Sequence, residues 1–204
     1  MENNIKVAVH PGIGFGSKLN TKQLNVLLHY LPEDSEVELT VFQQLYIEIN
    51  EEKYEQMKSD FNDAGLECYP VGFYVKSLRT CNFCKGAEEE GMPVAIQLNK
   101  RIAGQPVPFP LRPAYTGCPN ACGEPLINDI GVIKKQDGYD LYIGGKAKGI
   151  DAKIGRVFKS GLTPEELYET VDQLIDLYRS NGKKREHFSR FIDRFGWDNL
   201  QARE

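Results

Sequence analysis

The hydrophobic and polar positions of residues 1–70 predict short strands that alternate with amphipathic helices. An apolar run over residues 5–9 predicts a strand, and aliphatic side chains that alternate with polar ones over residues 45–49 predict another. A further strand is predicted over residues 36–40, and a charged helix over residues 51–64. Four leucines at helical spacing predict a helix between the strands over residues 5–9 and 36–40: Leu24, Leu27, Leu28 and Leu31. The order of strand, helix, two strands and helix is most of a ferredoxin-like unit, so this segment is predicted to be an α+β half-domain.

The pattern of residues 71–204 predicts a second α+β region. A helix is expected over residues 86–101, and the proline-rich stretch at residues 105–113 must be extended. Residues 131–143 read as a β-hairpin. Thr163, followed by a proline and two glutamates, is typical of a capped helix start. The helix that it opens has apolar side chains at core spacing: Leu167, Val171, Leu174, Ile175 and Tyr178.

Composition and charge exclude several function classes. The 204 residues include 25 basic and 29 acidic side chains, for a net charge of −4, which argues against nucleic acid as the main partner. The basic C-terminal stretch contains Glu186, Asp193 and Asp198, so it reads as a solvated helix face. The chain shows neither a membrane-length apolar run nor a signal-like start. We therefore expect a cytoplasmic protein with no membrane partner.

Two further motifs are candidate sites. Gly12, Gly14 and Gly16 follow a predicted strand, but their spacing is not the G-x-G-x-x-G of a phosphate loop, and a structural turn is the better interpretation. The three histidines carry no H-x-x-x-H spacing, which favours surface or core roles: His10, His29 and His187.

The cysteines are the informative feature of the composition. Five cysteines in a chain without an export signal are more typical of ligands or redox groups than of disulfides. Four of them form two close pairs, Cys81 with Cys84 and Cys118 with Cys122. Four thiolates suit either tetrahedral Zn²⁺ or a [4Fe–4S] cluster. The second pair has three intervening residues rather than two, so the spacing favours iron–sulfur over zinc.

The sequence around the second pair resembles the nitrite and sulfite reductase family. The run Thr-Gly-Cys-Pro-Asn-Ala-Cys at residues 116–122 carries the resemblance, with support from residues 129–132 and 142–146. Residues 39–43 correspond to the Thr-x-Arg-Gln strand of the family's half-domain, and residues 187–196 are similar to its closing helix. The resemblance implies an α+β fold: a ferredoxin-like half-domain, followed by a sirohaem/[4Fe–4S] domain.

The resemblance also implies roles for individual residues. The cluster ligands would be Cys81, Cys84, Cys118 and Cys122, and Cys122 would also be the axial ligand of the sirohaem iron. Sirohaem carries eight carboxylates, so polar and basic side chains are expected near it: Asn120, Arg79, Lys85, Lys146 and Lys148. A surface role stays open for each lysine. The family usually separates its first two cysteines by five residues, whereas here two intervene, so Cys81 is the least secure ligand and Cys68 is the alternative.

The family's substrate cations are depleted in this chain. The Thr-x-Arg-Gln arginine is Phe42 here, and a second arginine is absent unless His10 replaces it. Arg79 and Lys76 are further candidate substitutes. The family's Lys-x-Lys positions fall on Pro110 and Arg112, which leaves Arg112 as the predicted catalytic cation. We therefore expect poor reduction of sulfite and nitrite.

The resemblance further implies a small-molecule substrate and a separate electron-donor protein. It also implies a homodimer that rebuilds the family's two-copy arrangement. Two alternatives stay open: a tetrapyrrole- and cluster-binding or electron-transfer protein that reduces neither anion, and a zinc-stabilised module without enzyme activity.

Overall fold

The chain divides into two compact units, residues 1–71 and 72–204. The computed structural model describes residues 3–84 and 88–201. Among these residues, no helix is both long enough and apolar enough to span a membrane. Each unit has its own sheet.

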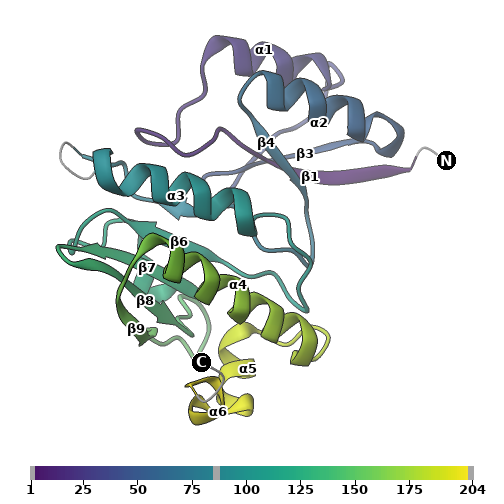
Figure 1. The fold of residues 1–204 in the computed structure, drawn as a ribbon. Coiled ribbons are helices and arrows are strands. Elements are labelled where there is room, and N and C mark those ends of the chain that lie inside the picture. The colour runs from purple at the N-terminus through teal and green to yellow at the C-terminus, as the bar shows by residue number, and fades with distance from the viewer. Residues whose placement is uncertain (1–2, 85–87, 202–204) are drawn as a thin grey trace. The chain divides into compact units, whose positions relative to one another are not determined.

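The first unit has the strand and helix order predicted from the sequence. Its elements are β1 (Asn4–His10), α1 (Thr21–His29), β2 (Glu38–Leu39), β3 (Leu45–Asn50), the short 3₁₀ helix η1 (Glu51–Lys53), α2 (Tyr54–Asp63) and β4 (Glu67–Pro70). The four strands form an antiparallel sheet in the order β2-β3-β1-β4, and α1 and α2 run side by side against it (Figure 1). The predicted ferredoxin-like topology is confirmed, and β4 completes it.

The apolar face predicted for α1 is partly wrong. Of its leucines only Leu27 is buried, whereas Leu24 and Leu28 are 41% and 63% exposed. Gln23 takes a buried position instead, because its amide donates to the Gly65 carbonyl and its side chain closes a capping box with Asn20. The polar contact to the α2–β4 turn therefore sets the rotation of the helix.

Residues 40–44 form a turn rather than part of a strand. Thr40 Oγ1 donates to the Gln44 carbonyl at 2.8 Å and accepts the Gln44 backbone N–H, while Gln43 has a φ of 61°. The turn shortens β2 to two residues, so only residues 38 and 39 of the expected strand over residues 36–40 are in a strand. Phe42 lies in this turn.

The second unit is built on a mixed sheet. Its elements are β5 (Arg79–Thr80), α3 (Glu88–Ile102), β6 (Pro113–Thr116), the short 3₁₀ helix η2 (Pro125–Ile127), β7 (Ile130–Lys135), β8 (Gly138–Ile143), β9 (Arg156–Leu162), α4 (Pro164–Asn181), α5 (Phe188–Phe195) and α6 (Trp197–Gln201). The strand order is β5-β6-β7-β8-β9. The first three strands are parallel, and the last two join antiparallel.

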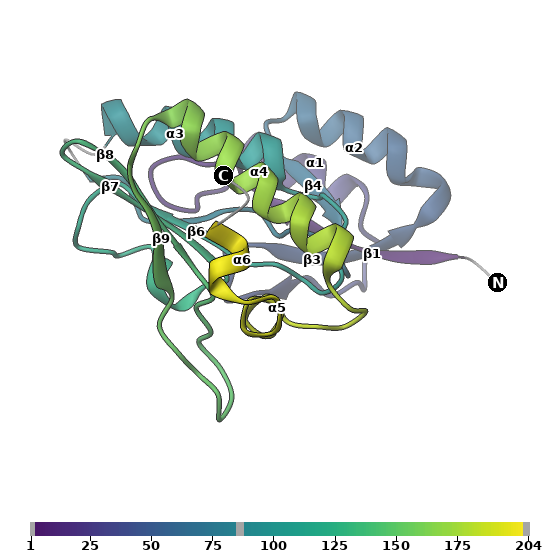
Figure 2. The same ribbon diagram turned by 60° about the horizontal axis from the view of Figure 1, so that its bottom comes forward.

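Helices α3 and α4 pack on each other over one face of this sheet (Figure 1). The predicted start of α4 is confirmed, because Thr163 and Glu166 form a reciprocal capping box and every predicted core position of the helix is buried. Figure 2 shows the long β8–β9 connection extending beyond the edge of the sheet. Two strands were not predicted from the sequence: β5, which has two residues, and β9, whose pairing is irregular.

Candidate functional site

The parallel pairing of β5 and β6 brings the two cysteine segments, residues 81–84 and 118–122, to one edge of the sheet. Arg79 and Thr80 pair with Ala114 and Tyr115, so both strands end at the same level. Cys81 follows β5 directly, and Gly117 and Cys118 follow β6. The carboxyl ends of parallel strands meet at one edge, which is a usual place for a ligand site in such sheets.

Two glycines pack the second cysteine segment against the first. The Gly117 N–H donates to the Cys81 Sγ at 3.4 Å, which brings the residue before Cys118 against the Cys81 thiol. A Cβ on Gly123 would lie 2.1 Å from the Tyr115 carbonyl oxygen and 3.1 Å from the Cys81 nitrogen. Only glycine permits this approach, so Cys122 is held beside the same strand ends.

The four thiols differ in exposure. Cys81 is buried, Cys118 is half-buried, and Cys84 and Cys122 are exposed. All are free thiols, and the loops that carry them contain left-handed residues, Phe83 and Ala121 among them. The Phe83 ring is buried and stacks on Tyr115 with 5.9 Å between ring centroids, which anchors the first loop.

This donor set fits an iron–sulfur cluster. Cluster sulfurs accept backbone N–H groups, and the Cys81 sulfur already does so in this structure. Across residues 3–84 and 88–201, no three Cys, His, Asp or Glu side chains converge tightly enough to hold a single metal ion. A [4Fe–4S] cluster takes one thiolate at each of four irons, so its ligands need not meet at one point.

Cys68 has a different environment. It lies in β4 of the first unit and belongs to that unit's hydrophobic core. Burial raises the pKa of its thiol to about 11, which opposes formation of the thiolate that a metal requires. These surroundings suit a core residue.

Two of the residues predicted near a tetrapyrrole lie close to the cysteines. Arg79 begins β5, and its guanidinium pairs with Glu124 at 2.9 Å, two residues after Cys122. Asn120 is exposed between Cys118 and Cys122. Lys85 falls outside the described residues.

The predicted cation Arg112 lies at the other end of β6. Its backbone N–H donates to Asp129 Oδ2 at 2.9 Å, and Asp129 directly precedes β7. The Asp129 carbonyl accepts the Gly144 N–H at 2.8 Å, which ties the end of β8 to the same edge. Five residue steps separate Arg112 from Gly117, about 16 Å along an extended strand. Arg112 and the cysteines are therefore at opposite edges of the sheet.

Other basic groups surround Arg112. His187, the N-cap of α5, has a pKa lowered by burial and by the charges of Lys146, Arg112 and Arg190. Lys146 Nζ donates to Asp151, and Arg190 pairs with that carboxylate at 3.7 Å. We call Arg112, Lys146, His187 and Arg190 the basic cluster. The predicted Lys148 is exposed on the β8–β9 connection.

Burial raises the pKa of the Asp129 carboxyl to about 7, against the opposing effects of the Arg112 N–H and the Arg112 and Lys146 charges. No catalytic or binding role was predicted for Asp129, His187 or Glu124. Asp129 stands in the run at residues 129–132 and His187 begins the run at residues 187–196, and both runs support the family resemblance, so they were the available signals. For Glu124 only its contact with Arg79 reveals a place in the site.

His10 does not supply the missing cation. It is 3% exposed, and its Nδ1 accepts the Gly12 N–H at 3.1 Å. Burial lowers the pKa of His10 to about 4, so the ring is neutral at pH 7. Gly12, with a φ of 84°, forms the turn that the glycine spacing indicated.

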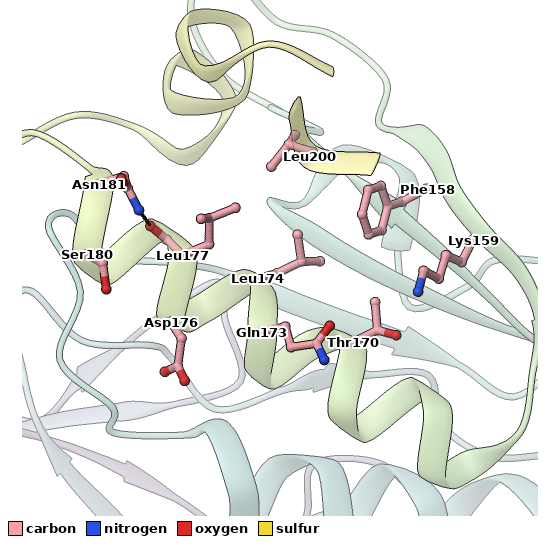
Figure 3. Close-up of a pocket in the computed structure, with 10 residues that line it drawn as sticks. All are labelled: Phe158, Lys159, Thr170, Gln173, Leu174, Asp176, Leu177, Ser180, Asn181 and Leu200. Carbon is pink, nitrogen blue, oxygen red and sulfur yellow. Dashed lines mark hydrogen bonds between the residues drawn. The ribbon is translucent and has the colours of Figure 1, made fainter. Parts of the chain in front are cut away.

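A separate pocket of about 330 Å³ lies between α4, β9 and α6 (Figure 3). Its apolar lining includes Phe158, Leu174 and Leu200, and polar side chains such as Lys159 and Asp176 lie around it. Neither the cysteines nor the basic cluster belong to its lining.

Comparisons with known proteins agree on the kind of domain. The family model described as "Nitrite and sulphite reductase 4Fe-4S domain" matches residues 74–203. The cobalt-factor III methyltransferase of Priestia megaterium is 28% identical over 97% of this chain and 37% of its own length. The assimilatory-type sulfite reductase of Nitratidesulfovibrio vulgaris is 25% identical over 72% of this chain and 65% of its own length.

A solved structure of dissimilatory sulfite reductase I shares the fold. It matches with a TM-score of 0.74 and 13% identity, over 98% of this chain and 68% of that one. The chain spans less than two thirds of the length of each of these two curated relatives.

Proposed function

Because the chain belongs to the nitrite and sulphite reductase 4Fe-4S domain family, whose members carry sirohaem and a [4Fe–4S] cluster, we propose that it is a redox protein that holds both cofactors. The observation that carries the proposal is the meeting of both cysteine segments at the end of β5 and β6. Cys81, Cys84, Cys118 and Cys122 would hold the cluster, and Cys122 would also help to hold the sirohaem. Together the two groups supply one-electron steps to a bound substrate.

The protein's own residues would set the environment of these groups. The Gly117 N–H, which donates to Cys81 Sγ, would stabilise negative charge on the cluster sulfurs and so raise the reduction potential. Arg79 and Asn120 flank the cysteines and would bind polar groups of the tetrapyrrole. The basic cluster, Arg112 included, lies at the opposite edge of the sheet and would bind carboxylates of the tetrapyrrole rather than a substrate held beside the cysteines.

We expect weak turnover of sulfite and nitrite. Phe42 and Pro110 occupy two of the family's cationic positions, and His10 is neutral at pH 7. Charge-assisted hydrogen bonds contribute about 1.5–3 kcal/mol each, so losing two or more would slow anion reduction by roughly 10³-fold or more.

The deciding experiment is anaerobic purification, followed by absorption spectroscopy and iron and sulfide analysis. The proposal expects Soret and red bands of sirohaem, with four cluster irons and one haem iron per chain. A broad shoulder near 400 nm without haem bands would indicate a protein that holds the cluster alone. A colourless protein with zinc would contradict the proposal. Turnover with reduced methyl viologen then tests activity, and rates of many per second for sulfite or nitrite would contradict the weak-turnover expectation.

A second candidate function has support from one relative. The cobalt-factor III methyltransferase match covers 97% of this chain, and that relative's name refers to a cobalt-containing factor. The chain would then bind a tetrapyrrole as substrate rather than reduce an inorganic anion. A cluster without sirohaem, together with tight binding of a cobalt tetrapyrrole to the purified protein, would favour this candidate.

The partners follow from the same proposal. Reduction needs a small-molecule substrate and a separate electron-donor protein. Two chains would pair as a homodimer, which light scattering at micromolar concentration would reveal, and a cofactor-loaded monomer would contradict it. We place the protein in the cytoplasm, where free thiols persist.

A further inference from the structure

We propose that Thr116 is a positioning residue of the cysteine site, whose buried hydroxyl donates a hydrogen bond to the cluster sulfurs and so favours the reduced cluster. This role rests on the proposed function, because it needs the cluster, but it falls to a residue outside the four predicted ligands. Two features of the second unit support it: the place of Thr116 beside Cys81, and the absence of a hydrogen-bond partner for its hydroxyl among the described residues.

Thr116 ends β6 and lies beside Cys81. The last residue of β5 pairs with Tyr115, so the next position along both chains places Cys81 opposite Thr116. The Cys81 N–H donates to the Tyr115 carbonyl at 3.2 Å, and the Gly117 N–H donates to the Cys81 Sγ at 3.4 Å. The residues on both sides of Thr116 are therefore hydrogen-bonded to Cys81.

The Thr116 side chain lies on the sheet face opposite α3. Tyr115 points towards α3, because its ring stacks on Phe83 and a Cβ on Gly91 of that helix would meet its hydroxyl at 2.8 Å. Successive side chains of a strand point to opposite faces, so Thr116 shares the other face with Cys81, its neighbour in the register. The hydroxyl and the thiol are thus neighbours on one face of the sheet.

The Thr116 hydroxyl is a buried polar group. The residue is 0% exposed, and its Oγ1 has no hydrogen-bond partner within residues 3–84 and 88–201. This state is destabilising, because the hydroxyl has lost its hydrogen bonds to water and gained none in return. Cluster sulfurs accept hydrogen bonds, and a hydroxyl can rotate its proton towards an acceptor. A cluster beside Cys81 would therefore satisfy the donor that the fold leaves unpaired.

The hydroxyl should affect the loaded and the cofactor-free chain with opposite signs. Reduction adds negative charge to the cluster, and hydrogen bonds to the sulfurs stabilise that charge. Loss of the Thr116 hydroxyl should therefore lower the reduction potential, although every ligand is retained. In the cofactor-free chain the same loss removes an unpaired buried group and should stabilise the fold. A residue that only packs would leave the potential unchanged.

The experiment compares wild type with Thr116→Val, which keeps the shape of the side chain, in both forms of the full chain. In the anaerobically purified form, a redox titration followed by EPR should show a roughly tenfold shift towards the oxidised cluster, equal to about 59 mV for one electron. Thr116→Ser restores the hydroxyl and should return the potential to the wild-type value. In the cofactor-free form, urea unfolding should give Thr116→Val an unfolding constant about tenfold smaller than that of wild type.

Ser77→Ala is the matched control. The Ser77 hydroxyl is also buried and unpaired within the part of the chain that the structure describes, but it lies four residues before Cys81. This variant should stabilise the cofactor-free chain and leave the potential of the cluster unchanged.

Several outcomes overturn the proposal: a potential that Thr116→Val does not lower, that Thr116→Ser does not restore or that Ser77→Ala lowers equally, and a cofactor-free Thr116→Val that is less stable than wild type. A wild-type chain without iron or sulfide overturns the proposed function, and the role of Thr116 with it. A wild-type cluster with a potential that ignores Thr116→Val overturns the role of Thr116 alone.

Discussion

The two units use cysteine in opposite ways. Cys68 of the first unit lies inside a sheet and within a hydrophobic core, where burial raises the pKa of its thiol to about 11. The four cysteines of the second unit follow strand ends, two of them exposed, and one sulfur accepts a backbone N–H. The contrast teaches that position relative to strand ends, rather than the number of thiols, separates a core residue from a candidate ligand.

The largest effect is expected from replacing one cysteine in each unit. Cys122→Ala should reduce the iron content of anaerobically purified protein to on the order of a tenth of wild type or less, because a cluster that lacks one thiolate is poorly held. Cys68→Ala is the matched control and should keep full iron, with only a modest loss of stability from the small cavity. Equal iron loss in both variants would contradict the assignment.

A second test compares one glycine from each unit. Gly123→Ala should lower the free energy of unfolding by about 3 kcal/mol, because the new Cβ would meet the Tyr115 carbonyl at 2.1 Å. Gly14→Ala should change it by less than about 0.5 kcal/mol, since nothing lies within 4 Å of its Cβ. Urea unfolding followed by circular dichroism measures both, and fluorescence of Trp197, the single tryptophan, reports on the second unit. A neutral Gly123→Ala would mean that the cysteine segments do not pack as described.

The third test uses His10, the buried imidazole of the first unit. The pKa of His10 is about 4 when folded and near 6.5 when unfolded, so the unfolded chain binds the proton between these values. The stabilising contribution is therefore complete above pH 6.5 and is lost as pH falls through 4, amounting to about 3 kcal/mol.

Urea unfolding at pH 4 and at pH 7 should show this loss in wild type, and His10→Gln should lack it. Asp129 acts with the opposite sign, since its raised pKa makes the folded chain bind the extra proton between about pH 4 and 7. An identical pH dependence in wild type and His10→Gln would contradict the burial of a neutral ring.

Local signals predicted much of the fold correctly. The capping residue, proline and glutamate at the start of α4 act within one helical turn, and the buried positions of that helix follow from its own periodicity. The leucines of α1 show where such reasoning stops. Their spacing predicted one buried face, but the Gln23 hydrogen bond to Gly65, 42 residues away, rotates the helix so that Leu24 and Leu28 remain exposed.

The sequence by itself determined the two cysteine pairs and the motif around the second pair, and through the family resemblance it predicted that residues 42 and 110 lack cations. Only the tertiary structure decided which of these groups meet. A two-residue strand, β5, brings Cys81 beside Gly117, while the length of β6 separates Arg112 from the cysteines and Asp129 accepts its backbone N–H. Pairing between distant strands depends on backbone hydrogen bonds that leave no local pattern in the chain, so spacing along the sequence could name the ligands but not the edge of the sheet that each one occupies.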